Sequence, residues 1–184
     1  MTELVARQTS LLVENVVNGL KPAPNVIYIS PPKTDVIYDD GKLWLVDPSH
    51  EVATPKPSVD RFLLSLADKH GEKSMAIILS GTGTDGAYGV QAIREAGGIT
   101  IAQDTESAKY DGMPMSAMQT GCVDLVLRPF EIGTHLRKIL TSPRDFDESR
   151  QETTEKSPLS IPMRNTHSSV GSIRMQSMHC LRTC

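Results

Sequence analysis

Hydrophobic positions repeat with two different periods along the middle of the chain. A helical stripe opens at Pro57 and stops at Gly71, with apolar residues three and four positions apart: Val59, Phe62, Leu63, Leu66 and Ala67. Short apolar runs typical of buried strands follow at 76–79, 99–103 and 123–127. Helical patterns come after each of them, at 86–96, 113–120 and 131–140. Because single helices between strands require right-handed crossovers, this rhythm predicts a doubly wound, mainly parallel sheet flanked by helices in a Rossmann-like three-layer α/β fold.

The first fifty residues predict a helix, a strand and a hairpin. Apolar residues at mostly helical intervals predict a helix over 2–18 that stops at Gly19. A strand is expected at 26–29, bounded by prolines, which cannot continue a central ladder. The β-prone runs 35–38 and 42–46 flank an Asp-Gly pair, which predicts a β-hairpin appended to the sheet.

Periodicity ends near residue 141. Residues 142–184 are rich in Ser, Thr and charged side chains. Such a segment cannot bury enough apolar surface to offset the entropy of ordering, so we expect a disordered C-terminal tail. The chain of 184 residues is then one domain over 1–141 followed by this tail.

Charge and cysteine usage exclude several classes of function. The formal net charge is -3, and the chain has neither basic blocks nor aromatic platforms, which argues against a nucleic-acid partner. The three cysteines are scattered, which favours a reduced, cytoplasmic setting over a disulfide framework and indicates no zinc site. No signal peptide and no apolar run of membrane-spanning length is present, so we expect no membrane insertion.

The glycine-rich loop before residue 87 is the candidate site. It carries Gly81, Gly83, Asp85 and Gly86 between a predicted strand and a predicted helix. In a parallel sheet such a loop lies at the carboxyl edge, where ligands and catalytic groups gather. The loop lacks the Lys-Ser/Thr pair of a P-loop and its aspartate would repel phosphate, which argues against nucleotide binding. Asp85 is then either a helix-capping carboxylate or the residue that orients a histidine in a nucleophilic triad.

A second polar loop follows the strand at 99–103, on the same side of the predicted sheet. Tyr110 and Asp111 could bind a substrate there, although Asp111-Gly112 is equally typical of an ordinary turn. The chain has no Gly-x-Ser-x-Gly elbow. Of its five histidines, only His50, in the proline-rich loop at 48–57, is a candidate catalytic base, and no residue pattern supports that role for any of the five.

Six short motifs occur between residues 57 and 124: Pro57-Ser-Val-Asp60, Ile78-Leu-Ser-Gly-Thr-Gly-Thr-Asp-Gly86, Ala96-Gly-Gly98, Ala102-Gln-Asp104, Ala108-Lys-Tyr-Asp-Gly-Met-Pro114 and Gly121-Cys-Val-Asp124. Together they resemble the catalytic domain of chemotaxis protein-glutamate methylesterases of the CheB type. The threonine in the glycine loop and the form of 108–114 are most similar to versions fused to a receptor methyltransferase. The resemblance covers about residues 1–140 and stops at the tail.

The resemblance implies a cytoplasmic α/β hydrolase that acts on methyl-accepting chemoreceptors. Such enzymes hydrolyse glutamate methyl esters, and many deamidate glutamines, through a Ser-His-Asp triad without metal or organic cofactor. By motif, Asp85 corresponds to the triad aspartate. Thr82 and Gly83 lie near the family's oxyanion site, and Tyr110 and Asp111 are substrate-site candidates.

One part of the family pattern is missing. The nucleophilic serine and the histidine of the family precede the segment that matches residues 1–20. We therefore expect 1–141 to be an N-terminally truncated catalytic domain that is inactive alone, and a chain or segment supplying Ser and His would complete a split enzyme. The alternative is a non-catalytic module that binds receptors or other partners through the face around Asp85 and Tyr110.

Overall fold

The computed structural model describes residues 1–46 and 57–141. The elements in chain order are α1 (Thr2–Ala6), β1 (Leu12–Asn15), β2 (Val26–Ile29), β3 (Asp35–Asp39), β4 (Lys42–Val46), α2 (Val59–His70), the 3-10 turn η1 (Gly71–Lys73), β5 (Met75–Ile78), α3 (Ala87–Glu95), β6 (Ile99–Gln103), α4 (Gly112–Gln119), β7 (Leu125–Leu127) and α5 (Pro129–Thr141). Every helix in this part of the chain is too short or too polar to cross a bilayer. The predicted disordered tail and the loop that carries His50 lie outside the described residues.

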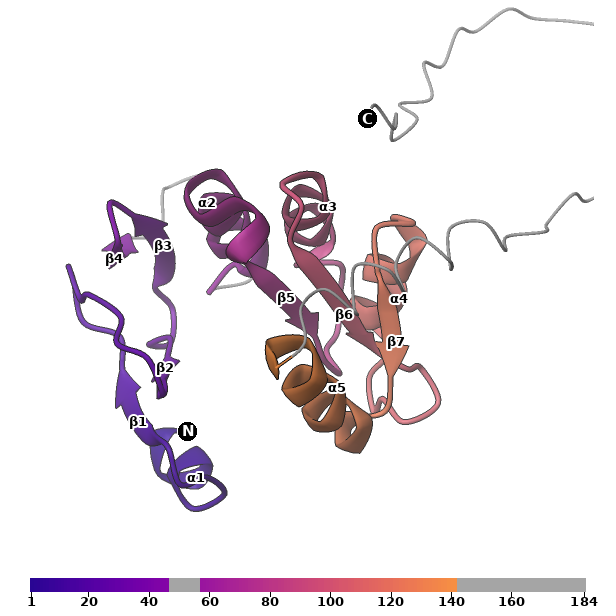
Figure 1. Ribbon diagram of the computed structural model, residues 1–184, viewed down its shortest axis with the longest axis horizontal. Coiled ribbons are helices and arrows are strands. Elements are labelled where there is room, and N and C mark those ends of the chain that lie inside the picture. The colour runs from indigo at the N-terminus through magenta and orange to yellow at the C-terminus, as the bar shows by residue number, and fades with distance from the viewer. Residues whose placement is uncertain (47–56, 142–184) are drawn as a thin grey trace, which may run out of the picture.

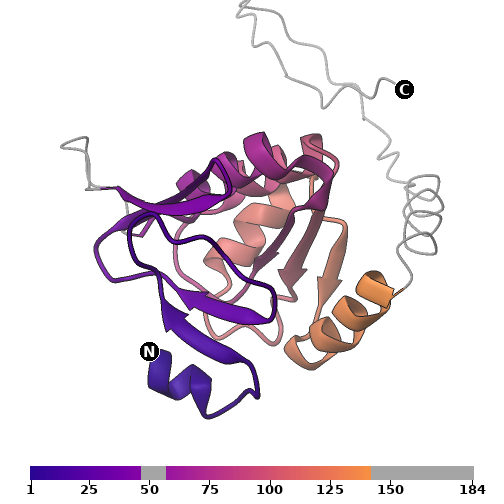
Figure 2. The same ribbon diagram turned by 60° about the vertical axis from the view of Figure 1, so that its left-hand side comes forward.

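The central sheet consists of β5, β6 and β7 in that order, all parallel. Helices cover both of its faces, with α2 and α3 on one side and α5 on the other (Figure 1, Figure 2). Side chains alternate between the two faces along β5, as the period of a strand requires. Ala76 and Ile78 pack toward α2, α3 and α4, whereas Met75 and Ile77 pack toward α5. The predicted three-layer parallel architecture is therefore confirmed.

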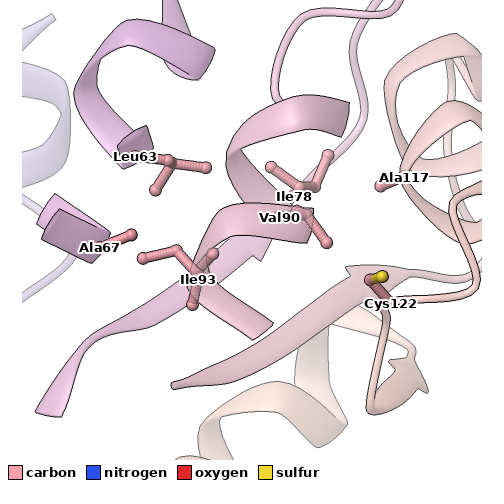
Figure 3. Close-up of a cluster of buried hydrophobic side chains, with 8 residues drawn as sticks. Leu63, Ala67, Ile78, Val90, Ile93, Ala117 and Cys122 are labelled. Atoms are coloured by element: carbon pink, nitrogen blue, oxygen red, sulfur yellow. The ribbon is translucent and has the colours of Figure 1, made fainter. Parts of the chain in front are cut away.

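The larger core lies between the sheet and the helices α2, α3 and α4 (Figure 3). Val90 and Ile93 on α3 are fully buried at its centre. The helices α2 and α3 are in close contact at Gly89, where a methyl group in place of the glycine hydrogen would lie 2.5 Å from Cβ of Leu63. This close approach brings the N-terminal turns of the two helices together.

The prediction of a single helix over 2–18 is wrong. The helix α1 ends at Ala6, and residues 12–15 form β1, which pairs in parallel with β2. The short apolar runs of this segment fit the period of a helix and that of a strand. Pairing with β2 provides hydrogen-bond partners for the backbone, and the local pattern does not show this pairing. Among the described residues, this two-stranded sheet is separate from the three-stranded one.

The predicted hairpin is confirmed. Strands β3 and β4 pair antiparallel, and the turn between them has positive φ at both central residues, +48° at Asp40 and +72° at Gly41. An Asp-Gly pair tolerates this left-handed conformation at low cost, which is why it closes a two-residue hairpin. The hairpin packs on α2 through a small second core that contains Val36, Leu43 and Phe62.

Candidate functional site

Asp85 lies in the loop between β5 and α3, and its carboxylate is bound by the first turn of α2. Oδ2 accepts a hydrogen bond from the Val59 N–H at 2.8 Å. Oδ1 accepts one from the Asp60 N–H at 2.9 Å and one from the Ser58 hydroxyl at 3.3 Å. The positive end of a helix dipole also favours a carboxylate at this position. Since a carboxylate offers about four lone-pair directions, one direction on Oδ2 remains for a further donor.

Asp85 caps the neighbouring helix rather than its own. The N-cap residue of α3 is Gly86, whose φ of +99° favours glycine. A methyl group on Gly86 would also lie 2.9 Å from Cδ1 of Ile78 and 3.2 Å from Cγ1 of Val59. The chain therefore passes very close to α2 at this glycine, and Asp85 is turned toward that helix.

Asp60, in the first turn of α2, makes the reverse contact. Its Oδ1 accepts a hydrogen bond from the N–H of Gly89 in α3 at 2.7 Å. Burial raises the pKa of Asp60, the Gly89 amide opposes this by favouring the charged form, and the nearby charge of Asp85 adds to the rise. Asp85 thus accepts hydrogen bonds from α2, the helix that contains Asp60, and Asp60 accepts one from α3, the helix that follows Asp85.

A third aspartate fixes the start of α2 from the hairpin side. Asp35, at the beginning of β3, is completely buried, and its Oδ1 accepts the Ser58 N–H at 2.8 Å. Its Oδ2 lies 3.1 Å from Nη1 of Arg61. The turn that binds Asp85 is therefore itself held by an ion pair between a buried carboxylate and a partly exposed arginine. The predicted site residues did not include Asp35, Ser58 or Asp60, although the Pro57–Asp60 motif was a signal for two of them.

The glycine loop and the second polar loop are joined by backbone hydrogen bonds. The Gly81 N–H donates to the Tyr110 carbonyl at 2.9 Å, and the Tyr110 N–H donates to the Ser80 hydroxyl at 3.0 Å. The loops touch again at Gly112, where a methyl group would lie 2.9 Å from the Gly83 nitrogen. The predicted oxyanion candidates are thereby brought beside the predicted substrate candidates.

All four of these candidates are exposed, which suits contact with a partner or substrate: Thr82, Gly83, Tyr110 and Asp111. The Tyr110 ring has the Lys109 ammonium 5.3 Å from its centroid. Asp111 is the N-cap residue of α4 but makes no side-chain cap hydrogen bond. Within the described part of the chain, no hydrogen bond joins Asp85 to this group of four.

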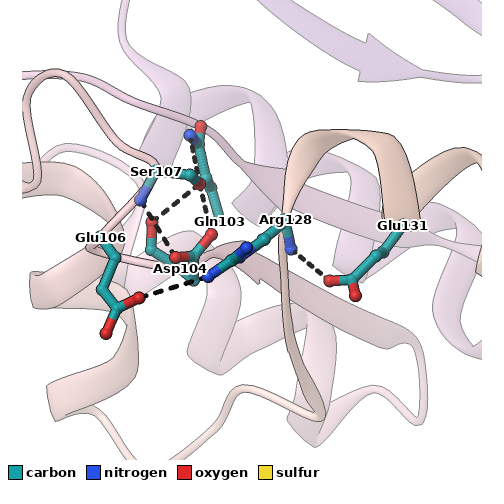
Figure 4. A network of polar contacts seen from close by, with 6 residues as sticks. All are labelled: Gln103, Asp104, Glu106, Ser107, Arg128 and Glu131. Atoms are coloured by element: carbon teal, nitrogen blue, oxygen red, sulfur yellow. Dashed lines mark hydrogen bonds and ion pairs between the residues drawn. The ribbon is translucent and has the colours of Figure 1, made fainter.

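A polar network orders the loop that leads to Tyr110 (Figure 4). Asp104 accepts hydrogen bonds from the hydroxyl and from the N–H of Ser107, and the Ser107 hydroxyl also accepts from Gln103 Nε2 at 3.1 Å. The Ser107 hydroxyl lowers the pKa of Asp104, and the charge of Arg128 contributes to the same shift. Gln103 extends the network to the glycine loop, because its Oε1 accepts the Ser80 N–H at 2.9 Å.

The described residues provide no histidine beside Asp85. His70 lies against the Tyr38 ring, with 5.3 Å between centroids, and Nδ1 of His135 lies 3.0 Å from the Glu131 carbonyl oxygen. Ser58 does contact Asp85, but its hydroxyl oxygen also accepts the Arg61 N–H, as an N-cap does. Within residues 1–46 and 57–141, no group of three or more His, Cys, Asp or Glu side chains is arranged to hold a metal ion.

An apolar cavity of about 200 Å³ adjoins the turn that binds Asp85. It lies between β2, the hairpin and α2, and its lining residues are Val16, Tyr28, Ser30, Val36, Leu43, Pro57, Ser58, Val59 and Phe62. Typical ligand sites are larger, about 300–1,000 Å³. The cavity therefore suits one or two apolar side chains better than a free small molecule.

Comparison with known proteins identifies similar sequences and a similar structure. The family model for CheB methylesterase matches residues 1–136. A protein-glutamate methylesterase/protein-glutamine glutaminase of Carboxydothermus hydrogenoformans is 36% identical over 132 residues, which are 69% of this chain and 39% of that protein. The protein-glutamate methylesterase FrzG of Myxococcus xanthus is 35% identical over 133 residues, which are 72% of this chain and 40% of that protein.

An uncharacterised 104.1 kDa protein of Rhodobacter capsulatus is 38% identical over 133 residues, covering 72% of this chain and 14% of that protein. The chain thus spans between 14% and 40% of the length of these three relatives. The crystal structure of the CheB methylesterase catalytic domain of Thermotoga maritima superposes with a TM-score of 0.68 at 29% identity, over 75% of each chain.

Proposed function

The chain belongs to the CheB methylesterase family, and we propose that Asp85 is the aspartate of a Ser-His-Asp centre that hydrolyses glutamate methyl esters on methyl-accepting chemoreceptors. In this proposal residues 1–141 are part of one cytoplasmic catalytic domain. The serine and the histidine come from a chain or segment outside the described residues. The same centre would deamidate receptor glutamines, because both reactions pass through an acyl intermediate.

The proposed reaction is acyl transfer followed by hydrolysis. The serine oxygen attacks the ester carbonyl while the histidine takes the hydroxyl proton, and the tetrahedral intermediate expels methanol once the histidine returns that proton. Water then attacks the acyl-enzyme by the same route and releases the glutamate carboxylate. Asp85 holds the histidine tautomer and stabilises the imidazolium. Backbone N–H groups at Thr82 and Gly83 are the proposed donors to the oxyanion, and Tyr110 and Asp111 the proposed substrate contacts.

One observation carries this proposal: the Asp85 carboxylate is bound by three donors and has one lone-pair direction left on Oδ2. A carboxylate held in this way loses little freedom when an imidazole N–H binds it, which is the preorganisation that a triad needs. A carboxylate that served only to cap α2 would account for the three donors. The family match and the position at the carboxyl edge of the sheet favour the catalytic role.

The sheet offers a place for a segment that would carry the serine and the histidine. Strand β5 is an edge strand of the described three-stranded sheet, and none of the strands in residues 1–46 and 57–141 pairs with its outer side, where a further parallel strand would be added. A strand added there would end at the same edge as β5, and the loop after it would emerge beside residues 80–86. This geometry supports a segment that delivers its catalytic side chains next to Asp85.

The test combines the full chain with the part of the Carboxydothermus hydrogenoformans methylesterase that precedes the region matched by this chain. We expect methanol release from methylated receptor by the mixture and background release by either polypeptide alone. Asp85→Asn should lower kcat of the mixture by about 10³- to 10⁴-fold. Asp68→Asn, an equal charge change at an exposed position of α2, is the matched control. Equal activity of the Asp85→Asn and Asp68→Asn mixtures would refute the catalytic role.

The exposed Tyr110 side chain favours a second candidate, a non-catalytic module that binds receptors or other partners. The residue is 52% exposed, at the end of a loop that backbone hydrogen bonds join to the glycine loop. Aromatic side chains of this kind often dominate binding interfaces. The methanol-release assay of the mixture separates the candidates, because a non-catalytic module should bind receptor, lose affinity with Tyr110→Ala, and release methanol only at the background rate.

A further inference from the structure

Asp60, in the first turn of α2, contacts both the Asp85 carboxylate and the helix α3. The N–H of Asp60 donates to Asp85, and the carboxylate of Asp60 accepts from Gly89 in α3. Both contacts are short, 2.9 Å and 2.7 Å. A displacement of Asp60 therefore moves one hydrogen-bond donor to the Asp85 carboxylate, and it also moves the first turn of α3.

The packing of the two helices keeps this link rigid. At Gly89 the α3 backbone lies against Leu63, one turn after Asp60 on α2, with no room for a methyl group. The approach at this glycine brings the Asp60 carboxylate within reach of the α3 backbone. It also determines the distance between the α2 N-terminus and the loop that carries Asp85.

We propose that Asp60 is a positioning residue for Asp85, which fixes the direction of the remaining lone pair on Asp85 by clamping α3 against the first turn of α2. The inference rests on the proposed function, because a fixed lone pair matters where a histidine must bind it. Asp60 itself is not catalytic, since its carboxylate contacts the backbone of α3. What it supplies is a hydrogen-bond acceptor, and an asparagine at this position keeps that acceptor while removing the charge.

The first test compares Asp60→Ala with Asp60→Asn in the complemented mixture. We expect Asp60→Ala to lower kcat by about 10- to 100-fold with KM unchanged, since small misplacements of catalytic groups have effects of this order. Asp60→Asn should restore kcat to within about threefold of the wild type, because its amide oxygen can accept the Gly89 N–H. The inference would be overturned if both variants lost kcat equally, or if only KM changed.

A second variant leaves both carboxylates intact. Gly89→Ala adds a methyl group that Leu63 cannot accommodate without a shift of α2 against α3. We expect it to lower kcat with KM unchanged, as Asp60→Ala does. Gly133→Ala is the matched control, because this glycine also lies in a helix but has no neighbour within 4 Å of the added methyl group. An unchanged kcat in Gly89→Ala would contradict the positioning role.

Amide hydrogen exchange on the full chain alone separates this inference from the proposed function. The Val59 N–H, which donates to Asp85, should exchange at least about fivefold faster in Asp60→Ala and at nearly the wild-type rate in Asp60→Asn, because the loss of a buried hydrogen-bond partner opens the local structure. Unchanged Val59 exchange in Asp60→Ala would refute the clamp even if Asp85 proves catalytic. Faster exchange together with a fully active Asp85→Asn mixture would confirm the clamp and reject the triad.

Discussion

Arg94 on α3 and Asp124 just before β7 form an ion pair, with Nη1 and Oδ1 2.8 Å apart. The Asp124 side chain is only 4% exposed. Its Oδ2 accepts hydrogen bonds from the N–H and the hydroxyl of Thr100 in β6, at 2.9 Å and 3.0 Å. One carboxylate thus connects α3, β6 and the start of β7, and it anchors the helix whose N-terminal loop carries Asp85.

Removal of the arginine should destabilise the fold. Arg94→Met takes the cation away from a buried carboxylate, and breaking a pair of this kind costs about 3 kcal/mol in the free energy of unfolding. Urea unfolding of the full chain should show a lower midpoint with an unchanged m-value. Arg128→Met is the control, because Arg128 and its partner Glu106 are both exposed and their pair contributes about 1 kcal/mol or less. Equal losses in the two variants would mean that the Asp124 carboxylate does not depend on Arg94.

The packing at Gly89 predicts opposite effects of one substitution at two helical glycines. Gly89→Ala should lower the free energy of unfolding by about 1–3 kcal/mol, since overpacking against Leu63 outweighs the gain in helix propensity. Gly133→Ala should raise it by about 0.5–1 kcal/mol, because the added methyl group meets nothing and reduces the entropy of the unfolded chain. Thermal unfolding measures both. A stabilised Gly89→Ala variant would show that the helices can separate without cost.

Local signals were enough to predict most of the elements. The helical stripe of α2 and the Asp-Gly turn of the hairpin both depend on residues close together in the sequence, and both are confirmed. The strand at 12–15 was missed because its identity depends on pairing with β2, which a helical interval between apolar residues does not reveal. The role of Asp85 could be predicted only as two alternatives. Which helix a carboxylate caps is decided by the tertiary approach of α2 to α3.

The contact between Asp104 and Ser107 predicts a change in acid titration. Because the Ser107 hydroxyl lowers the pKa of Asp104, the stability contributed by Asp104 is present above its unfolded pKa and is lost as pH falls through its folded pKa. Ser107→Ala should raise the pKa of Asp104 toward its ordinary value. Arg128→Met should raise it less, since the arginine is the weaker of the two influences. NMR titration of the side-chain carboxyl carbon measures both shifts, and a larger shift in Arg128→Met would contradict this order.

Asp60 predicts the opposite dependence on pH. Burial raises its pKa in the folded chain, with the charge of Asp85 adding to the rise, so the folded state binds the Asp60 proton more tightly than the unfolded state does. The stability linked to this proton is present below the unfolded pKa of about 4 and is lost as pH rises through the folded pKa. Asp60→Asn keeps the acceptor for Gly89 and cannot ionise, so it should become more stable relative to the wild type as pH rises through that interval.

Urea unfolding between these two pKa values measures the difference in stability, with Asp68→Asn as a control that should follow the wild type. If Asp60→Asn instead loses stability relative to the wild type as pH rises, the attraction between the ionised Asp60 carboxylate and the α3 N-terminus outweighs the cost of its burial.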